Sequence, residues 1–251
     1  MAAPRNKLKA ALADGARLEG LWLNLGSDNV AEIAGMCGFD WCLIDAEHGP
    51  WDPVGIQAQL RTLEPTPAEA IVRVPAAETW ILKQVLDLGA QTILVPIINT
   101  PQEAQAVVRA CRYPPEGIRG NGASVARATR FGAIQGYQAS ANAEICVIVQ
   151  IETAEAVANI EAIAAVEGID GLFIGPADLA ADMGYLAEPD HPDMQAAIKD
   201  AILRIHAAGK PSGIVSHSDE TRARYRALGV NLQSLGGDAG VLREALLRLP
   251  Q

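Results

Sequence analysis

Residues 146–178 read CVIVQIETAEAVANIEAIAAVEGIDGLFIGPAD. An apolar run at 146–153 is followed by residues 154–165, whose apolar side chains recur with helical spacing, and then by a second apolar run at 171–178. Both runs are rich in Val, Ile and Leu, which is typical of parallel strands covered on both faces. The stretch therefore predicts a strand–helix–strand unit with parallel strands.

The same rhythm recurs along the whole chain. A length of 251 residues, 49% of them hydrophobic, suits one barrel better than two small domains. We therefore predict an α/β fold, a (β/α)8 TIM barrel, formed as a single domain by residues 1–251. The expected strands are residues 18–26, 41–48, 70–75, 92–99, 146–153, 171–178, 211–216 and 232–236; helical patterns follow, for example at 31–37, 79–88, 103–112 and 154–165.

Charge and composition exclude several classes of partner. The net charge of -10 and a pI near 4.9 leave no basic face for nucleic acid or anionic membranes. Residues 1–15 lack the apolar core of a signal peptide, and apolar runs such as 92–98 are too short to span a membrane. The four cysteines form no CxxC pair and lie in apolar segments, so we expect reduced, buried thiols in a cytoplasmic protein and no thiolate-bound zinc.

Polar residues gather at the predicted strand ends. In this fold the carboxyl ends of the strands meet at a common mouth, where polar side chains are usually functional. The second strand ends in Asp45, Glu47 and His48, the third carries Arg73, the fifth ends in Gln150 and Glu152, and the sixth in Asp178. An acid, a base and a cation are thus predicted to converge.

Glu152 and Asp178 are candidate metal ligands. They end consecutive strands, about 4.8 Å apart in a sheet, so both carboxylates can reach one ion. Hard oxygen ligands select Mg²⁺, Mn²⁺ or a similar divalent ion and leave positions open for a chelating substrate. The alternative is that both carboxylates cap the helices that follow.

His48 is a candidate general base, because the pKa of histidine lies near neutrality. A base of this kind needs an orienting partner. Asp45 is the local candidate, whereas Asp87, near the end of a predicted helix, would reach His48 only across the barrel rim or from a neighbouring subunit. The alternative is a loop histidine at the turn before Gly49 and Pro50.

Arg73 lies among apolar strand residues, where a guanidinium requires an anionic partner. That partner is either a substrate carboxylate or enolate oxygen, or an ion pair with Glu47 or Glu152. No lysine occupies the carboxyl end of a predicted strand, which disfavours a Schiff-base mechanism. Enolate chemistry at this mouth would then need a metal as electron sink.

Two segments interrupt the regular rhythm, residues 113–138 and residues 184–193. Active sites of barrels are built by the loops that follow strands. We interpret both segments as substrate-covering loops on the active face.

Several separated motifs, running from about Gly20 to the end, resemble those of the HpcH/HpaI aldolase family. They are Phe39-Asp40-Trp41, Ile44-Asp45-Ala46-Glu47-His48, Leu94-Val95-Pro96, Tyr113-Pro114-Pro115-Glu116-Gly117-Ile118-Arg119-Gly120, Val149-Gln150-Ile151-Glu152-Thr153 and Phe173-Ile174-Gly175-Pro176-Ala177-Asp178-Leu179.

The resemblance implies a metal-dependent (class II) pyruvate aldolase, a lyase of aromatic compound catabolism. Its reaction would cleave 4-hydroxy-2-oxo acids, 4-hydroxy-2-oxoheptanedioate in particular, to pyruvate and an aldehyde, here succinate semialdehyde. The resemblance also implies Mg²⁺, Mn²⁺ or Co²⁺ as cofactor and a homohexamer in which the last helix, residues 241–249, packs on a neighbouring subunit. The implied roles are His48 as proton acceptor, Arg73 as enolate stabiliser, Asp87 as the group that raises the basicity of His48, Glu152 and Asp178 as metal ligands, and Gln150, Ala177, Asp178 and Arg73 as substrate contacts.

The late part of the chain departs from the expected pattern. Residues 213–218 and 231–237 are more polar than a heptanedioate enzyme would lead us to expect, which leaves the acceptor aldehyde open. A 2-keto-3-deoxy sugar-acid aldolase shares the catalytic residues. A citramalyl- or malyl-CoA lyase would need a basic patch for its nucleotide, and a non-catalytic sensor would bind a 2-oxo acid without turnover.

Overall fold

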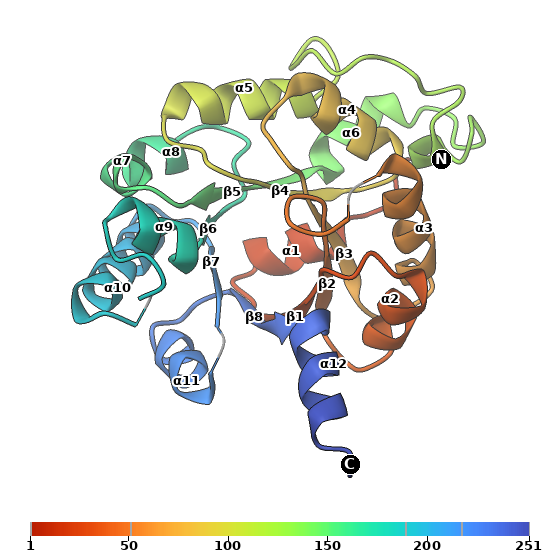
Figure 1. Cartoon of the computed structure of the whole chain (residues 1–251). Helices are drawn as coiled ribbons and strands as arrows, with labels where there is room; N and C mark the ends of the chain where they lie inside the picture. The colour runs from red at the N-terminus through yellow and green to blue at the C-terminus, as the bar shows by residue number, and fades with distance from the viewer. Residues whose placement is uncertain (1, 51, 189, 217, 251) are drawn as a thin grey trace.

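Eight parallel strands pair in chain order and close into a barrel, because β8 pairs with β1 as well as with β7 (Figure 1). The computed structural model describes residues 2–50, 52–188, 190–216 and 218–250. The predicted α/β fold, a (β/α)8 barrel, is confirmed. The strands are β1 (Leu18–Leu23), β2 (Trp41–Asp45), β3 (Glu69–Arg73), β4 (Thr92–Val95), β5 (Cys146–Ile151), β6 (Gly171–Ile174), β7 (Ser212–Val215) and β8 (Leu232–Gly237).

Helices surround the barrel and bury its outer face. The apolar outward side chains of the strands form one large core with the inner faces of the helices. The helices are α1 (Lys7–Ala13), α2 (Asp28–Gly35), α3 (Pro53–Leu63), α4 (Thr79–Asp87), α5 (Pro101–Cys111), α6 (Gln138–Glu144), α7 (Ala154–Ala158), α8 (Ile160–Ala164), α9 (Pro176–Asp182), α10 (Pro192–Ala207), α11 (Asp219–Ala227) and α12 (Asp238–Leu247), with a 3₁₀ turn η1 (Arg127–Thr129).

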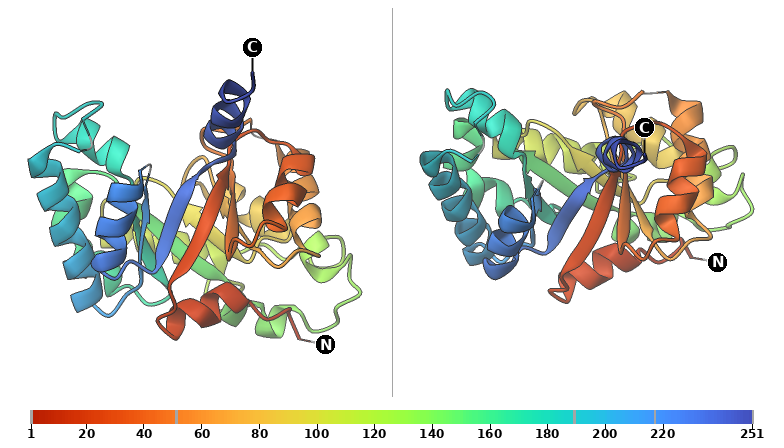
Figure 2. Two further views of the ribbon diagram at one scale, coloured as in Figure 1. Left: turned by 90° about the horizontal axis from the view of Figure 1, so that it is seen from below. Right: turned by 60° about the horizontal axis from the view of Figure 1, so that its bottom comes forward.

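The barrel interior is packed, and α1 closes its amino-terminal end. Leu8 and Leu12 of α1 join the inner cluster that includes Trp41 and Phe173. Figure 2 shows α1 across the end of the barrel opposite to α12. The sequence analysis did not predict this helix. We call this end the floor and the carboxyl-terminal end the mouth.

Seven of the eight observed strands end earlier than predicted, and β8 ends one residue later. The second strand ends at Asp45 rather than at residue 48, and the sixth ends at Ile174 rather than at residue 178. The motifs at these positions therefore belong to the turns that leave the sheet and enter the mouth. The helix predicted over residues 154–165 is two short helices, broken at Asn159, whose side chain donates to the backbone oxygen of Asn99 (2.8 Å).

The interpretation of residues 113–138 as a substrate-covering loop is wrong. This segment follows α5, which runs back towards the floor, and Figure 2 shows it at the same end of the molecule as the N-terminus. Tyr113, Ala128 and Tyr137 pack with Ala3, and Arg127 donates to the backbone oxygen of Leu88 (3.1 Å). Residues 184–193 do lie between α9 and α10 on the mouth side, although Pro189 lies outside the described residues.

Three of the four cysteines are buried thiols, as expected. Burial raises the pKa of Cys42 and Cys111 to about 12 and that of Cys146 well above its ordinary value. Cys37 is exposed, so the prediction is wrong for it, because the residue follows the end of α2 in a turn.

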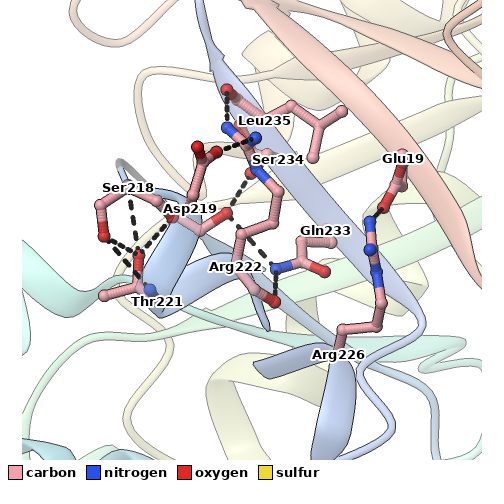
Figure 3. A network of polar contacts seen from close by, with 10 residues as sticks. Glu19, Ser218, Asp219, Thr221, Arg222, Arg226, Gln233, Ser234 and Leu235 are labelled. Atoms are coloured by element: carbon pink, nitrogen blue, oxygen red, sulfur yellow. Dashed lines mark hydrogen bonds and ion pairs between the residues drawn. The ribbon is translucent and has the colours of Figure 1, made fainter. Parts of the chain in front are cut away.

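The polar residues of β8 and of the segment that follows β7 have structural partners, and Figure 3 shows those around Gln233 and Arg222. The Gln233 side chain donates to the backbone oxygen of Arg222 (2.9 Å), and Arg222 donates to that of Leu235 (3.1 Å), which ties α11 to β8. The Ser216 hydroxyl donates to the Ser234 carbonyl (2.6 Å), and Arg226 pairs with Glu19 of β1. Some of the polar residues noted at 213–218 and 231–237 therefore hold β8 to its neighbours, where the barrel closes. His217 lies outside the described residues.

Helix α12 projects from the mouth side and packs against little of its own chain (Figures 1 and 2). Its large apolar side chains, Val241, Leu242, Leu246 and Leu247, are exposed. The expected contact with a neighbouring subunit stays a prediction. Among the described residues, no helix has the length and apolar character that crossing a membrane requires.

Candidate active site

The mouth brings together most of the predicted site residues. Arg73 ends β3, Glu152 directly follows β5, and Asp178 lies in the first turn of α9. The charges of Asp178, Glu47 and Arg73 all affect the pKa of Glu152, and those of Arg73, His48 and Asp178 affect that of Glu47. Residues far apart in the sequence therefore form one electrostatic unit.

Arg73 is held by two carboxylates and an aromatic ring. Its Nε and Nη2 donate to the two oxygens of Asp45 at 2.9 and 2.8 Å, a bidentate geometry, and its Nη1 lies 2.7 Å from Glu47 Oε2. The guanidinium also stacks 4.3 Å above the Trp22 ring. The predicted ion pair with Glu47 is present, and Asp45 is a second partner that the sequence analysis did not assign to Arg73.

Glu152 is almost fully buried, with 3% of its surface exposed. The backbone N–H of Ile97 donates to its Oε2 (3.0 Å), and Gln150 donates through Nε2 to its Oε1 (2.6 Å). Burial raises the pKa of Glu152 to about 7, and the neighbouring acids Asp178 and Glu47 add to the rise, against the bond from Ile97 and the charge of Arg73. Among the described residues, the structure gives Glu152 no ion pair that would offset its burial.

Strained backbone supports the Glu152 position. Ile97 has φ of +51°, a left-handed conformation that is unfavourable for a β-branched residue. Its N–H points at Glu152 as a result. On the other side, a Cβ on Gly175 would lie 2.3 Å from Glu152 Oε1, so only glycine leaves room for the carboxylate.

The capping alternative for the two acids is not what the structure shows. Thr153 caps α7, its hydroxyl accepting from the N–H of Ala156 (3.0 Å). The N-cap of α9 is Gly175, and Asp178 makes no capping bond there. Both carboxylates are therefore available to the mouth.

The donor set at the mouth fits a hard divalent cation. Within the described chain, no cluster of three or more His, Cys, Asp or Glu side chains is arranged to hold a metal. Glu152 and Asp178 would supply two carboxylates and leave the other positions of a cation open. The unbalanced negative charge around Glu152 supplies the electrostatic reason for a cation. Gln150 Oε1 is buried without a hydrogen-bond partner in the described part of the chain, so a further polar group faces this region.

The candidate base and its predicted partner lie apart. His48 is exposed at the mouth, and its backbone N–H donates to Asp45 Oδ1 (3.3 Å), but the structure gives its ring no bond to Asp45. Asp87 is the last residue of α4, towards the floor, and accepts from Arg119 (2.8 Å). Among the described residues, the chain does not bring Asp87 to His48.

A profile of the HpcH/HpaI aldolase/citrate lyase family matches residues 18–245. The chain belongs to this family. It is 50% identical over 238 residues to a hydroxypyruvate/pyruvate aldolase of Agrobacterium fabrum, covering 95% of this chain and 90% of that protein. It is 47% identical over 240 residues to a 4-hydroxy-2-oxo-heptane-1,7-dioate aldolase of Shigella sonnei, covering 96% and 92%.

A solved structure supports the same assignment. The crystal structure of a HpcH/HpaI aldolase/citrate lyase family protein from Burkholderia cenocepacia J2315 superposes with a TM-score of 0.94 at 41% identity, covering 97% of each chain. The predicted family is confirmed, and with it the predicted enzyme class, an aldolase of the lyase type.

Sequence reasoning missed two contributors to this aldolase mouth. Trp22 supplies the ring beneath Arg73, and Ile97 supplies the N–H to Glu152. The position of Trp22 could have been predicted, because side chains alternate between the two faces of a strand and Trp22 falls on the inward face of β1. No sequence pattern announces a positive φ at Ile97.

Proposed function

We propose that this member of the HpcH/HpaI family is a divalent-metal-dependent aldolase that cleaves 4-hydroxy-2-oxo acids to pyruvate and an aldehyde. The observation that carries the proposal is the pair Glu152 and Asp178 beside Arg73 at one barrel mouth. The names of the two relatives support pyruvate chemistry. We take 4-hydroxy-2-oxoheptanedioate as the first substrate to test, with succinate semialdehyde as the aldehyde product.

Glu152 and Asp178 would hold the ion, for which Mg²⁺, Mn²⁺ and Co²⁺ are the candidates. When bound, such an ion stabilises the negative charge of a pyruvate enolate as a Lewis acid. Deprotonation of Glu152, whose pKa is raised to about 7, accompanies occupation of the site.

The protein's own groups bind and orient the 2-oxo acid. Arg73 places its guanidinium at the mouth and stabilises the enolate oxygen, an electrostatic role that its fixed geometry favours. Gln150, with its buried Oε1, and the backbone around Ala177 in the first turn of α9 contact the substrate. These groups select a small 2-oxo acid in one orientation.

His48 takes the proton of the 4-hydroxyl group in cleavage and the methyl proton of pyruvate in synthesis. Its exposure at the mouth leaves the ring free to reach substrate. Asp87 lies towards the other end of its own barrel, so we propose that it acts on the His48 of a neighbouring subunit in a homohexamer. The exposed apolar face of α12 is the second feature that supports such an assembly.

One alternative keeps the site and changes the donor. The Agrobacterium fabrum relative is named for hydroxypyruvate as well as pyruvate, so hydroxypyruvate is a second donor to test. The sequence-based predictions of a cytoplasmic location and of no nucleic-acid or membrane partner stay predictions.

The test is pyruvate release from racemic 4-hydroxy-2-oxoheptanedioate by metal-stripped enzyme, alone and with Mg²⁺, Mn²⁺ or Co²⁺. We expect release only with metal and a sharp loss in a His48→Ala variant. The same assay on 2-keto-3-deoxy sugar acids ranks the acceptors. No release from any 4-hydroxy-2-oxo acid with any of the metals would overturn the proposed function.

A further inference from the structure

Asp45 is the centre of a buried polar network behind Arg73. Its side chain is fully inaccessible, and besides the two bonds from Arg73 it accepts the side-chain amide of Asn24 (Nδ2 to Oδ2, 2.6 Å). The backbone N–H groups of Glu47 and His48 donate to its other oxygen, at 3.1 and 3.3 Å. Asp45 thus fixes the arginine and the loop that carries the base together.

Asn24 is itself held by the root of α12. The backbone N–H of Asn24 donates to Asp238 Oδ1 (2.8 Å), and that of Leu25 donates to Asp238 Oδ2 (3.2 Å). Asp238, the first residue of α12, is buried. A Cβ on Gly237 would lie 2.6 Å from Asn24 Oδ1, so glycine at this position leaves room for the Asn24 side chain.

We propose that Asn24, anchored by Asp238, is a positioning residue that orients the Arg73 guanidinium through Asp45. The proposal rests on the proposed function, in which Arg73 holds the enolate oxygen. The orientation matters because two carboxylates, Glu47 and Asp45, compete for the Arg73 guanidinium. Glu47 attracts Nη1 of Arg73 from one side, and the Asn24 amide fixes the Asp45 carboxylate that holds Nε and Nη2 on the other.

Loss of the Asn24 amide leaves Arg73 Nη2 as the remaining side-chain donor to Asp45 Oδ2, which lets the carboxylate and the guanidinium rotate together towards Glu47. Residues that orient metal ligands typically contribute about 10- to 100-fold to activity, and we expect the lower end of this range for a residue that orients Arg73. The effect should fall on the transition state, so kcat should fall while KM changes little.

The main experiment compares Asn24→Ala with Asn231→Ala. Asn231 is a matched control: it bridges the same seam between β1 and β8 at the floor, its amide donating to Ala16 O (3.2 Å). We expect kcat for pyruvate release to fall about tenfold in Asn24→Ala, with KM within about twofold, and to stay within about twofold of wild type in Asn231→Ala. Gly237→Ala, which displaces the Asn24 side chain by contact, should act like Asn24→Ala.

A pH profile separates orientation from general damage. In Asn24→Asp, two carboxylates face each other at high pH, and the new carboxyl group donates to Asp45 only when it is protonated. The charged groups around it are Asp45 of β2, Arg73 of β3, Glu47 after β2 and Asp238 of α12. The ratio of variant to wild-type kcat should therefore rise as pH falls from 8 to about 6, whereas the ratio for Asn24→Ala should stay flat.

A double-mutant test completes the design. In an Arg73→Lys background, Asn24→Ala should lower kcat by less than about a further twofold, because the guanidinium that Asn24 orients is absent. A tenfold cost in both backgrounds, or wild-type kcat in Asn24→Ala and Gly237→Ala, would overturn the inference. Failure of the proposed function looks different, since the wild-type enzyme would then release no pyruvate at all.

Discussion

The two ends of the barrel use charge in opposite ways. At the floor, charged side chains are matched: Lys7 lies 3.4 Å from Glu69, and Lys9 lies 3.4 Å from Asp170 and donates to the backbone oxygen of Ile145 (2.7 Å). The floor is also filled by α1, and Figure 2 shows that end covered.

At the mouth, acids outnumber the cation beside them. Glu47, Glu152 and Asp178 gather around Arg73, which Asp45 already holds, and the pKa of the buried Glu152 rises to about 7. Among the described residues, the chain thus tolerates the energetic cost of a buried, unpaired carboxylate at the mouth and not at the floor. Lys7 and Lys9 at the floor each have an acidic partner, whereas the acids around Glu152 at the mouth outnumber Arg73, which is where a cation and a substrate would bind.

The largest effect should come from removing one unmatched charge. Glu152→Gln keeps the shape and an oxygen that accepts from the Ile97 N–H, but removes the negative charge. We expect metal-dependent pyruvate release to fall on the order of 10³-fold. Steady-state kinetics and calorimetric Mn²⁺ binding measure the two consequences.

Glu155→Gln is the matched control, because Glu155 is an exposed acid in the first turn of α7. It should behave as wild type. Near-normal kcat and Mn²⁺ affinity in Glu152→Gln would mean that the surplus charge at the mouth does not serve a metal.

The floor should respond in stability and not in rate. Leu12 is 2% exposed and packs inside the barrel, so Leu12→Ala should lower the free energy of unfolding by about 2–5 kcal/mol. Chemical denaturation gives this value, and kcat at 25 °C should stay within about twofold of wild type. A large fall in kcat in the folded variant would show that floor and mouth are not independent.

The sequence predicted the barrel because its signals are local and repeated. Each strand is an apolar run followed by a helical pattern, and strand ends meet at one mouth in this fold, which placed Arg73, Glu152 and Asp178 together. Helix α1 was not predicted because, although Leu8 and Leu12 have helical spacing and Asn6 caps the helix, seven residues are too few for a clear periodic pattern.

The contacts behind the site were beyond the sequence for a different reason. Asp238 and Asn24 are 214 residues apart, and no spacing in the chain indicates that they meet. The role of residues 113–138 was misjudged because glycine and arginine content says nothing about the end of the barrel to which a segment returns. Local chemistry was readable, whereas long-range pairing of single polar residues was not.

A smaller effect concerns the strained backbone at the mouth. Ile97 is 54% exposed and has φ of +51°, so Ile97→Gly should relieve strain while losing little packing. We expect the free energy of unfolding to stay equal or to rise by up to about 1 kcal/mol, although a large-to-small change usually lowers it. Val125→Gly, at a 73% exposed position without positive φ, is the control and should not be stabilising.

The smallest expected effect is the release of a fraction of a proton when the metal ion binds. The folded-state pKa of Glu152, about 7, lies above its ordinary value of 4.5, so the folded metal-free enzyme binds this proton more tightly than the unfolded chain does. The stability that this proton contributes is fully present below about pH 4.5 and is lost as pH rises through about 7. Metal binding should displace the proton, so that about half a proton is released per ion at pH 7 and almost none at pH 8.5.

Calorimetry of Mn²⁺ binding in buffers of different ionisation enthalpy measures this release directly. In Glu155→Gln the release should match wild type, because Glu155 is exposed, whereas Glu152 is buried. Release that is equal at pH 7 and pH 8.5 would show that Glu152 is already ionised in the metal-free enzyme. The mouth would then carry its full negative charge before metal arrives, and its contrast with the floor would be larger still.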